Sequence, residues 1–561
     1  MDRLGLHGDA MRGLTGHRFA HYLLLLAVGS ALVFPYLGAP SLWDDDEGVN
    51  AECAREMAET GTWVVPLFNW ELRTAKPVFL YWLLRISYDA FGVNEFAARL
   101  PSALAFLGSI LLTYELGRRM FDATTGLLAA AIAASALELV KLGHAATPDS
   151  TLIFFLLLYF WAFWRGHENG GRSWYLPCGI ASALAMLVKG PVGLVLPVAI
   201  VGGYFLAHRE LRRLFDPRMI GGTAVWILVA IPWYALVTAE TRGEWTKAFF
   251  LKEYLGRSTE PMENHRGPWL YYLGVLAIFF APWSSLLPAA LKAAWTRAKV
   301  ADPGSRAVRF LLIWVAVVVV VFSLLATKLP HYIAPAYPAL AILIASYLVR
   351  WMRGEFEMPR WVTVMVVTGF ILTGSVVFVG MSLISADIGP IVGENRFKAR
   401  TFSGLADWAG IGLLPILGAG AFVWFARRGR RQWAVTALAT STVAFAGLLV
   451  AYPPVIVDRS KAVKVLVAES GARDLHRDAR IASYDYSQPS ITFYAARRVE
   501  RLHSPEAAAQ FLAMPHPSYL FVTAPTWDEW VIRFAKPPHR IAARRYDFYR
   551  NCDILVVVND R

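Results

Sequence analysis

AHYLLLLAVGSALVFPYL, residues 20–37, is followed after only five residues by WDDDE at residues 43–47. A helix that crosses a bilayer needs about 20 predominantly apolar residues, and this run is close to that length. No small-residue cleavage pattern comes after it, so we interpret it as a retained first span and not as a signal peptide. The sequence therefore predicts a membrane protein that carries a cluster of carboxylates directly outside its first helix.

The composition of the whole chain agrees with a location in the bilayer. The 561 residues are 56% hydrophobic and only 17% charged, whereas about a quarter of the residues in soluble domains are charged. Apolar runs predict about thirteen transmembrane helices. They lie near residues 20–37, 97–117, 125–142, 150–164, 173–188, 191–207, 220–239, 269–290, 309–326, 332–350, 361–384, 407–426 and 433–451. We expect an α-helical polytopic membrane protein.

The connections between these spans alternate in charge. Short basic connections such as Arg118-Arg119, Arg209 to Arg218 and Arg427 to Arg431 are expected in the cytoplasm by the positive-inside rule. The other connections then face the periplasm, and an odd number of spans places the C-terminus there as well. The net charge of +13 is assigned to these basic loops, so no nucleic-acid partner is predicted.

Two extramembrane parts are predicted. A transmembrane domain of residues 1–452 includes a long periplasmic loop, 38–96, in which Val49 to Thr60 and Val78 to Phe91 have the pattern of amphipathic helices at the membrane interface. Residues 453–561 are expected to form a small periplasmic α/β domain. Its predicted elements are a helix at 461–470 and strands at 479–484, 518–523 and 553–558. The cysteines Cys53, Cys178 and Cys552 suit neither a disulfide framework nor a metal cluster.

Several charged motifs fall on the predicted periplasmic face. They are Asp44 to Glu47, Ala75-Lys76-Pro77, His144 to Asp149, Lys189-Gly190-Pro191, Glu263 to Pro268 and Lys328 to Tyr332. Carboxylates and cations that converge in this way suit a reaction that holds an anionic phosphate while an acceptor approaches a sugar carbon.

These motifs resemble those of the GT-C membrane glycosyltransferases, most closely the aminoarabinose (4-amino-4-deoxy-L-arabinose) lipid A transferases, which are related to protein O-mannosyltransferases. The matching stretches are Leu42-Trp43 through Asp46-Glu47, Ala51-Glu52, Ala54 to Met57, Gly61 to Pro66, Lys76-Pro77, Tyr81-Trp82, Thr147-Pro148-Asp149 and Lys328-Leu329-Pro330 with Tyr332. The chain departs from the family pattern at Val49, Asn50, Arg73 and Ala75.

The resemblance implies a GT-C fold and a function. It implies transfer of aminoarabinose from undecaprenyl phosphate to a lipid A phosphate of lipopolysaccharide, with the active site on the periplasmic side of the inner membrane. That modification masks negative charge and gives resistance to polymyxin and cationic antimicrobial peptides. The implied partners are the lipid-linked donor, lipid A and membrane lipid. No cofactor is certain, and a divalent metal ion stays open.

Roles follow for individual residues. The expected catalytic residues are Asp46, Glu47 and Asp149, with Asp46 positioning the donor amino sugar or a cation. The expected substrate-binding residues are Lys76, Arg55, Arg73, Tyr81, His265, Arg266, Lys328 and Tyr332. Lys76 would neutralise the charge that grows on the leaving phosphate.

Structural alternatives stand beside these roles. The acidic cluster can be a solvated turn, and Asp149 can be the N-cap of the following helix. Lys76 can snorkel from an interfacial helix, and the His265-Arg266 pair can be a polar clasp of its loop.

Two other functions stay open. A polyprenyl-phosphate-dependent mannosyl- or hexosyltransferase acting on protein or glycan would have a hydroxyl acceptor, which would make Asp46 a general base. A flippase for lipid-linked sugars would be expected to carry charges in the middle of its spans, and these spans have few. The identity of the sugar, the metal requirement and the oligomeric state are not determined by the sequence.

Overall fold

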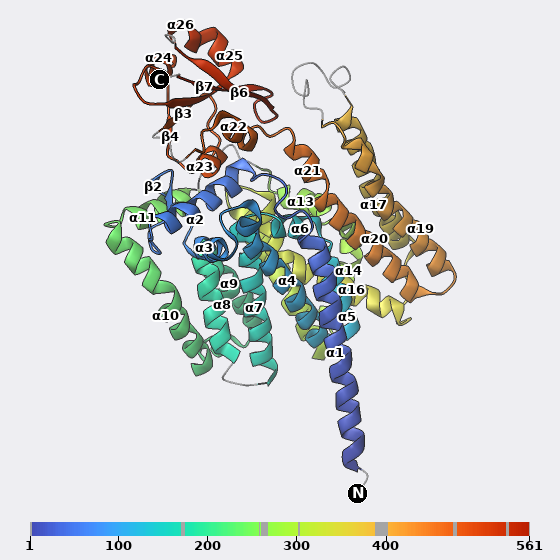
Figure 1. Cartoon of the computed structure of the whole chain (residues 1–561). Coiled ribbons are helices and arrows are strands. Elements are labelled where there is room, and N and C mark those ends of the chain that lie inside the picture. The colour runs from blue at the N-terminus through green and yellow to red at the C-terminus, as the bar shows by residue number, and fades with distance from the viewer. Residues whose placement is uncertain are drawn as a thin grey trace.

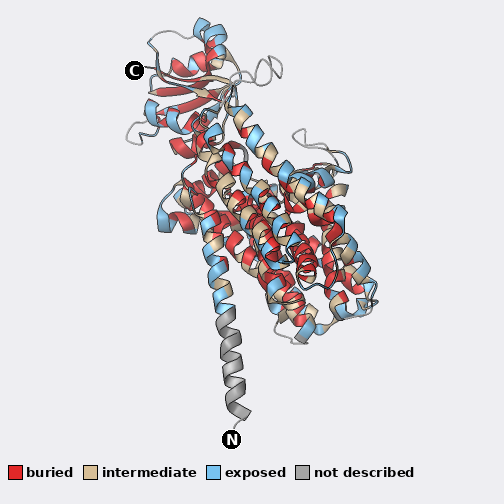
Figure 2. Cartoon of the chain, turned by 90° about the vertical axis from the view of Figure 1, so that its right-hand side faces the viewer, coloured by how far each residue is buried: buried red, intermediate tan, exposed pale blue. Residues whose placement is uncertain are grey.

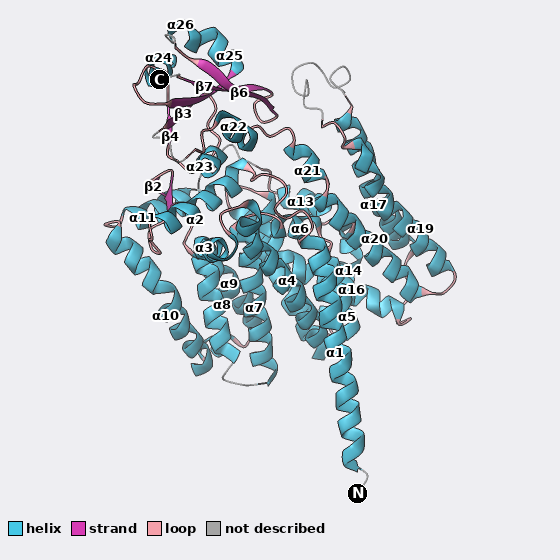
Figure 3. Ribbon diagram, viewed as in Figure 1, coloured by secondary structure: helices cyan, strands magenta, loops and turns pink. Residues whose placement is uncertain are grey.

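The computed structural model describes residues 3–169, 174–256, 259, 267–300, 303–386, 402–474, 479–534 and 538–559. A bundle of long helices makes up most of the molecule, and a smaller unit that contains a sheet lies at one end of it (Figure 1). The strands are confined to this unit and to one short hairpin beside it (Figure 3).

Every span predicted from hydropathy coincides with a helix or a bent pair of helices. These are α1 (Arg3–Val33), α4 (Glu95–Met120), α5 (Ala123–Ala134) with α6 (Leu137–Gly143), α7 (Pro148–Asn169), α8 (Tyr175–Lys189), α9 (Val192–Ala207), α10 (Pro217–Glu240), α13 (Tyr271–Phe279) with α14 (Leu287–Ala298), α15 (Pro303–Leu324), α16 (Tyr337–Met352), α17 (Arg360–Ser385), α19 (Leu413–Arg427) and α20 (Arg431–Ala451).

Not all of these helices are full-length spans. In the described part of the chain, 7 helices are long and apolar enough to cross a membrane, or up to 9 if each of two bent pairs counts as one. The α5–α6 pair bends by 68°, and the pair that contains α13 and α14 bends by 116°. Three further apolar helices are shorter than these candidate spans. They are Arg18–Val33 within α1, and the helices α8 and α9. The chain is a polytopic membrane protein in which several predicted spans are short or broken.

Short elements connect or extend these helices. They are η3 (Leu211–Phe215), α11 (Glu244–Lys247), η4 (Ala248–Gly256), η5 (Trp283–Leu286), η6 (Pro330–Ala336), η7 (Ala406–Gly412) and α21 (Pro453–Asp458).

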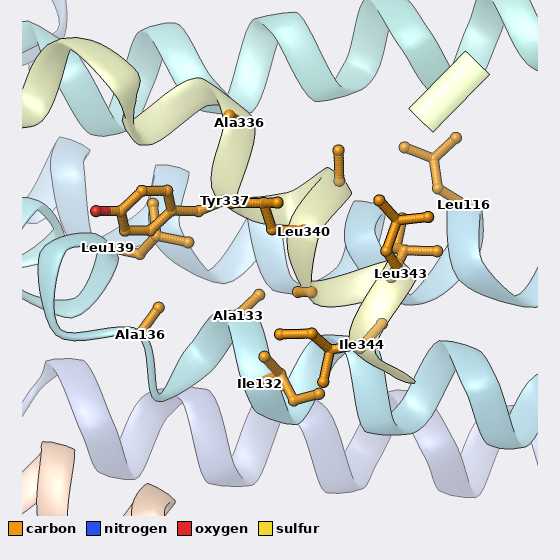
Figure 4. Close-up of a cluster of buried hydrophobic side chains, with 14 of the residues drawn as sticks. Leu116, Ile132, Ala133, Ala136, Leu139, Ala336, Tyr337, Leu340, Leu343 and Ile344 are labelled. Carbon is orange, nitrogen blue, oxygen red and sulfur yellow. The ribbon is translucent and has the colours of Figure 1, made fainter. Parts of the chain in front are cut away.

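Helix α16 is the centre of the bundle. Its sequence is apolar on all sides, which is the pattern of a helix that is surrounded by others. The window of this span is 89% buried, the largest share among the candidate spans. Leu340 and Ile344 lie against Ile132 and Ala133 of α5, where the small alanine allows the two helices to approach closely (Figure 4). Figure 2 shows buried residues running through the bundle and through the terminal unit.

The basic connections gather at the end of the bundle opposite the sheet (Figure 1). Arg119 in the last turn of α4 lies 3.7 Å from Glu168 at the end of α7, and Arg353 after α16 lies 2.9 Å from Asp122. Contacts of this kind between different connections place them on one face of the membrane domain, as the alternation of charge predicted.

The terminal unit contains a five-stranded sheet with the order β4-β3-β5-β7-β6. The strands are β3 (Arg480–Tyr484), β4 (Val499–Arg501), β5 (Ser518–Thr523), β6 (Arg540–Asp547) and β7 (Cys552–Val558). β3 is parallel to β4 and β5, while β7 is antiparallel to β5 and β6. The three predicted strands are confirmed as β3, β5 and β7, and the sequence analysis missed the edge strands β4 and β6.

Alternate residues of the central strands enter two different cores. Tyr519 and Phe521 of β5 pack into a core shared with the membrane-proximal helices, whereas Leu520 and Val522 pack on the opposite face. Helices cover both faces of this sheet. They are α22 (Val463–Ser470), α23 (Ser490–Ala495), α24 (Pro505–Leu512), α25 (Ala524–Thr526), η8 (Trp527–Val531) and α26 (Ile532–Phe534).

The loop after α1 contains η1 (Asp44–Gly48), α2 (Val49–Glu59), the hairpin β1 (Leu67–Phe68) and β2 (Glu71–Leu72), and α3 (Phe79–Phe91). The two predicted helices are present as α2 and α3, and α2 is far more buried than a single apolar stripe indicates. All residues from Val49 to Met57 are buried, because α3 covers one side of α2 and α23 of the terminal unit lies on another. An apolar stripe could not reveal this second cover.

Candidate functional site

The carboxylates of Asp44, Asp46 and Glu47 have three different environments, although they are neighbours in sequence. They lie in η1, which leads into α2. The Asp44 and Glu47 side chains are buried, whereas Asp46 is exposed. The side chain of Asp45 is outside the described part of the structure.

Glu47 forms a closed ion pair with Arg99 of α4. The Arg99 Nη2 and Nε atoms donate to the two Glu47 oxygens at 2.7 and 2.9 Å. The backbone N–H groups of Ala146 and Trp43 donate to the same carboxylate at 2.7 and 2.9 Å. Burial alone would raise the pKa of Glu47, but the guanidinium and the N–H donors outweigh it and hold the pKa below its ordinary value.

Arg99 is also fully used. It donates to the carbonyls of Leu37, Pro40 and Ser41 at 2.8–3.0 Å, in the chain segment just before the acidic cluster. The pair therefore connects the segment between α1 and η1 to the start of α4. A buried charge pair is tolerated when the remaining polar atoms are satisfied, and here they are.

Asp44 belongs to the contact with the terminal unit. Its Oδ1 accepts hydrogen bonds from the backbone N–H of Ser490, at 3.1 Å, and from the Ser490 hydroxyl. Burial raises the pKa of Asp44 to about 6. Lys461 holds the same segment from the terminal unit, because its Nζ donates to the carbonyls of Ser41 and Leu42 at 2.7 and 3.0 Å.

The Asp46 carboxylate is exposed and lines a cavity of about 440 Å³, which the buried Asp44 and Glu47 line as well. Within the described residues it accepts no hydrogen bond and forms no ion pair. The polar residues that line this cavity with it include Lys141, His144, Asp149 and His331. Asp46 is therefore available to a bound molecule.

Asp149 lies in the first turn of α7 and meets two basic side chains from other elements. Lys189, at the end of α8, forms a short ion pair with its Oδ1, and the Nε2 of His331 in η6 lies 3.9 Å from the same oxygen. The predicted alternative, an N-cap, does not describe this geometry, because α7 already begins at Pro148 and the carboxylate points to Lys189.

The turn after Lys189 is constrained. Gly190 has φ +80°, and a Cβ there would lie 2.7 Å from Phe249 and 2.9 Å from Tyr254. Only glycine is free to adopt this conformation so close to two rings. The Tyr254 hydroxyl also donates to the Lys189 carbonyl. The turn thus fixes the backbone at Lys189, while Asp149 holds its ammonium.

A second cavity, of about 230 Å³, lies on the other side of Asp149 and His331, which line both spaces. Its polar lining includes Lys76 and Lys189 together with Glu253. Most of the wall is apolar, and this part is formed by Leu152, Ile153, Val192, Val195, Val321, Phe322, Leu325 and Pro335. An apolar space with lysines in its wall suits a lipid with a phosphate head group.

The structure separates the other predicted substrate-binding residues. Tyr332 lines the apolar cavity, and Lys189 lies 5.2 Å above its ring. Arg55 is held by Glu52 and Glu59 of its own helix at 2.6–2.8 Å. Tyr81 is fully buried in a hydrophobic core. None of the atoms of Arg55 or Tyr81 lines either cavity described above.

Lys328 has a structural contact. Its Nζ donates to the carbonyls of Ser323 and Leu325 at 2.9 and 2.7 Å, where α15 ends. A cation at the C-terminus of a helix satisfies unpaired carbonyls and interacts favourably with the helix dipole. Arg73 lines a separate extramembrane cleft. His265 and Arg266 lie outside the described residues.

Sequence reasoning left four residues of this region unassigned. Lys189 and His331 were in motifs that it singled out, but they received no role. Arg99 and Lys141 were missed, although a charged residue at the edge of an apolar span is itself a signal of function.

Within the part of the chain that the structure describes, the carboxylates around Asp46 do not form a site for a divalent cation. In the described parts of the chain, no group of three or more His, Cys, Asp or Glu side chains is placed to hold a metal ion. The contacts give the reason. Asp44 is bonded to Ser490, Glu47 to Arg99 and Asp149 to Lys189, so among the described side chains Asp46 has no second carboxylate with which to share a cation.

Comparisons with known proteins bear on both sequence and fold. Residues 75–235 match the family model described as dolichyl-phosphate-mannose-protein mannosyltransferase. The undecaprenyl phosphate-alpha-4-amino-4-deoxy-L-arabinose arabinosyl transferases of Pseudomonas fluorescens and Pseudomonas aeruginosa are each 34% identical over 59% of this chain and 60% of their own. The chain thus aligns with about 60% of the length of these curated relatives.

The solved structures extend the likeness to the whole fold. ArnT from Cupriavidus metallidurans, bound to undecaprenyl phosphate, superposes with a TM-score of 0.80 at 22% identity and covers 97% of this chain and 98% of its own. The oligosaccharyltransferase AglB from Archaeoglobus fulgidus superposes with a TM-score of 0.52 at 13% identity, over 91% of this chain and 69% of its own. This chain is a sequence relative of the aminoarabinose transferases, and it has the GT-C fold.

Proposed function

We propose that this chain transfers 4-amino-4-deoxy-L-arabinose from undecaprenyl phosphate to a phosphate of lipid A. The observation that carries the proposal is the pair of cavities that share Asp149 and His331. The apolar cavity suits the first part of a polyprenyl chain, and the polar cavity suits a phosphorylated sugar. The reacting groups of two lipids would meet where the cavities adjoin. The expected consequence is resistance to polymyxin and cationic antimicrobial peptides.

Lys76 and Lys189 hold the donor phosphate in this proposal. Both line the apolar cavity, and they come from different elements, the segment after β2 and the end of α8. When the bond between the anomeric carbon and the phosphate oxygen breaks, the leaving undecaprenyl phosphate gains negative charge. Ammonium groups placed beforehand stabilise that charge more in the transition state than in the ground state. Asp149 keeps the Lys189 ammonium directed at the junction of the cavities.

The acceptor approaches from the polar cavity. A lipid A phosphate oxygen is already anionic at neutral pH, so it attacks the anomeric carbon without needing a general base. The new carbon–oxygen bond forms as the bond to undecaprenyl phosphate breaks, and one displacement inverts the anomeric carbon. Asp46 orients the donor through the ammonium group of the amino sugar, and Lys141 balances the charge of the acceptor phosphate.

Glu47 has a positioning role in this proposal. Its oxygens already accept hydrogen bonds from Arg99, Ala146 and Trp43 and have no capacity left for a substrate. It holds η1 so that Asp46 faces the cavity. Because Glu47 and Asp46 are neighbours, a resemblance in sequence cannot separate the two roles.

The orientation of the chain is part of the proposal. We assign the basic connections to the cytoplasm and the two cavities and the sheet-containing unit to the periplasmic side of the inner membrane. Reporter tags inserted after Arg119 and after Arg430 should be cytoplasmic, while a tag near Asn69 should be exported. A cytoplasmic tag at Asn69 would contradict this orientation.

The direct test is transfer by the purified protein in lipid nanodiscs. We expect mass spectrometry to find lipid A that has gained one aminoarabinose when the protein is supplied with undecaprenyl phosphate–aminoarabinose and lipid A. Asp46→Asn should abolish transfer while the protein still inserts and unfolds at the wild-type temperature, and Asp44→Asn should be milder. An equal loss at both positions would show that only the local negative charge matters.

A second function is favoured by one specific observation. The family model that matches residues 75–235 describes protein mannosyltransferases, whose acceptor is a hydroxyl group. With such an acceptor, Asp46 would take the proton as a general base. Polyprenyl phosphate–mannose with a serine-containing peptide should be inert if the first proposal is right. Mannosylation of the peptide without modification of lipid A would replace the first proposal with this one.

A further inference from the structure

A third and larger space lies outside both cavities, between the β1–β2 hairpin and the sheet-containing unit. It is a cleft of about 1410 Å³. Its lining residues come from the two ends of α2, from the hairpin and the residue after it, from η4 and from β3 and β4 with their connections. Arg73 and Lys252 line this cleft, whereas Lys76 and Glu253 line the apolar cavity. The short stretches 73–76 and 252–253 therefore border both the cleft and the apolar cavity.

The cleft is strongly basic. Its cationic lining residues are Arg73, Lys252, Arg480, Arg497, Arg498 and Arg501. Its carboxylates, in contrast, are only Glu59, Glu71 and Glu500. All of these carboxylates have cationic partners, since they lie 2.6, 3.8 and 2.9 Å from Arg55, Arg498 and Arg480. Within the described residues, Arg73, Lys252 and Arg501 form no ion pair. The positive charge of the cleft is thus not neutralised by the protein.

One of these cations is desolvated without being satisfied. The Nε of Arg73 is buried and has no hydrogen-bond partner among the described residues. A buried donor left unpaired costs about 1–3 kcal/mol, so such atoms in native structures call for an acceptor. An anionic group bound in the cleft would balance the charge of this guanidinium.

An unusual turn in the hairpin fixes the positions of the cleft walls relative to each other. Asn69 and Trp70, between β1 and β2, both have positive φ, of 56° and 63°. Asn69 stabilises this turn from outside, because its side-chain amide donates to the Val499 carbonyl at 2.9 Å and accepts from the Val499 N–H at 2.8 Å. The Trp70 N–H donates to Glu56 at 3.0 Å. These bonds join the hairpin to edge strand β4, so the shape of the cleft is preorganised.

The lining also contains a surface for a sugar ring. Trp70 lines the cleft and is 41% exposed, although it is a large apolar side chain. An exposed aromatic ring offers a flat apolar face on which a sugar ring can pack, and the cations beside it can pair with a phosphate. Together they suit a phosphorylated sugar.

We infer that this cleft binds the phosphorylated sugars of the acceptor glycolipid, outside the membrane, while one of its phosphates reacts in the polar cavity. The inference rests on the proposed function and adds a recognition site to it. The cleft selects acceptors by charge and has no role in binding the polyprenyl phosphate donor. Its loss should therefore raise the KM for the acceptor and leave kcat at saturating acceptor unchanged.

Charge reversal in exposed residues tests this without disturbing a core. Lys252→Glu combined with Arg501→Glu changes two exposed cations of the cleft, and the control is Arg533→Glu, an exposed arginine of the same terminal unit that does not line it. We expect the double variant in nanodiscs to bind a bisphosphorylated lipid A at least tenfold more weakly than wild type. Binding of undecaprenyl phosphate should stay within about twofold for all proteins.

Two further probes distinguish the source of the recognised phosphate. A dephosphorylated lipid A should bind the wild type and the double variant equally, and inorganic phosphate at millimolar concentration should compete only weakly, because it lacks the sugar. Complete competition by inorganic phosphate would overturn the assignment to a glycolipid.

The outcomes separate this inference from the proposed function. Equal lipid A binding by wild type and double variant would overturn the cleft and leave the transfer reaction standing. If lipid A binding depends on the cleft but no sugar is transferred, the inference about the cleft is supported and the proposed reaction is contradicted. If wild type does not bind lipid A at all, both are overturned.

Discussion

The Glu47–Arg99 and Asp149–Lys189 pairs are both nearly inaccessible to solvent, yet they differ in what surrounds them. Glu47 accepts hydrogen bonds from Arg99, Ala146 and Trp43, and Arg99 also donates to three backbone carbonyls. Glu47 and Arg99 line the polar cavity, as Asp149 does, but Asp149 also lines the apolar cavity, together with Lys189. The comparison teaches that a pair whose polar atoms are saturated by the protein holds the chain in place, whereas a pair that lies between two cavities can exchange a protein contact for a substrate contact.

The largest effect is expected where the saturated pair is broken. Arg99→Leu leaves the Glu47 carboxylate buried without its partner and the Leu37 and Pro40 carbonyls without donors, so we expect a loss of about 3–5 kcal/mol in the free energy of unfolding. Thermal unfolding in detergent and the yield of folded protein in membranes measure it. Arg119→Leu is the control on the same helix, because this arginine is more exposed and its pairs are as long as 3.7 Å. Equal losses for both variants would refute the special role of the saturated pair.

The open site should respond in activity and not in stability. Lys76→Ala should lower turnover and donor affinity together by about 10–100-fold, because a charge-assisted hydrogen bond to the donor phosphate is worth about 1.5–3 kcal/mol. Lys76→Arg should recover part of this loss. Undecaprenyl phosphate binding and single-turnover transfer in one detergent provide the measurement. A variant within about twofold of wild type would leave Lys189 as the main phosphate contact.

The contact between Asp44 and Ser490 should make the stability of the protein depend on pH. Its folded-state pKa of about 6 lies above the ordinary value of 3.8, so the folded protein binds this proton more tightly than the unfolded chain does. The stabilisation is fully present below pH about 4 and is lost as pH rises through about 6. Relative to Asp44→Asn, wild type should therefore lose about 1 kcal/mol between pH 5 and pH 7.5. A wild-type-minus-variant difference that does not change with pH would contradict this assignment.

The smallest effect is expected at Lys328, which serves as the comparison for Lys76. Lys328 contacts carbonyls at the end of α15 and does not line the apolar cavity. Lys328→Ala should cost no more than about 1 kcal/mol of stability, since a helix C-terminal cation contributes about that much. Transfer should stay within about twofold of wild type. A tenfold loss of turnover would return Lys328 to the substrate-binding residues.

Hydropathy predicted the bundle well, and local pattern predicted the terminal unit in part. The spans at 332–350 and 361–384 are continuous apolar runs, and both are single helices, α16 and α17. The run at 125–142 is equally apolar but bends by 68° between α5 and α6. Strands β4 and β6 were missed because β4 has only 3 residues and the burial of β6 follows no simple alternation.

The site was predicted as a set of segments, and its internal arrangement was not. The motifs around Asp46, Lys76 and Asp149 were identified, and the structure brings Lys76 and Asp149 to one cavity and Asp46 and Asp149 to the other. The sequence could not distinguish Asp46 from Glu47, because the difference depends on Arg99, 52 positions away in the chain. It could not assign Lys328 to its structural contact either, since the sequence around a loop lysine does not indicate which carbonyls its ammonium will contact.

By itself, then, the sequence determined that this chain is a polytopic membrane protein, which face its charged loops share, and which residue types are available there for phosphate and sugar chemistry. These properties depend on composition and on short periods of hydrophobicity, which are local. Only the tertiary structure decided that Glu47 is closed by Arg99 while Asp46 is open, that Asp149 lies between two cavities, and that the hairpin and β4 enclose a basic cleft. Those properties depend on contacts between distant segments, because burial and pairing decide whether a charged side chain holds the protein together or meets a ligand.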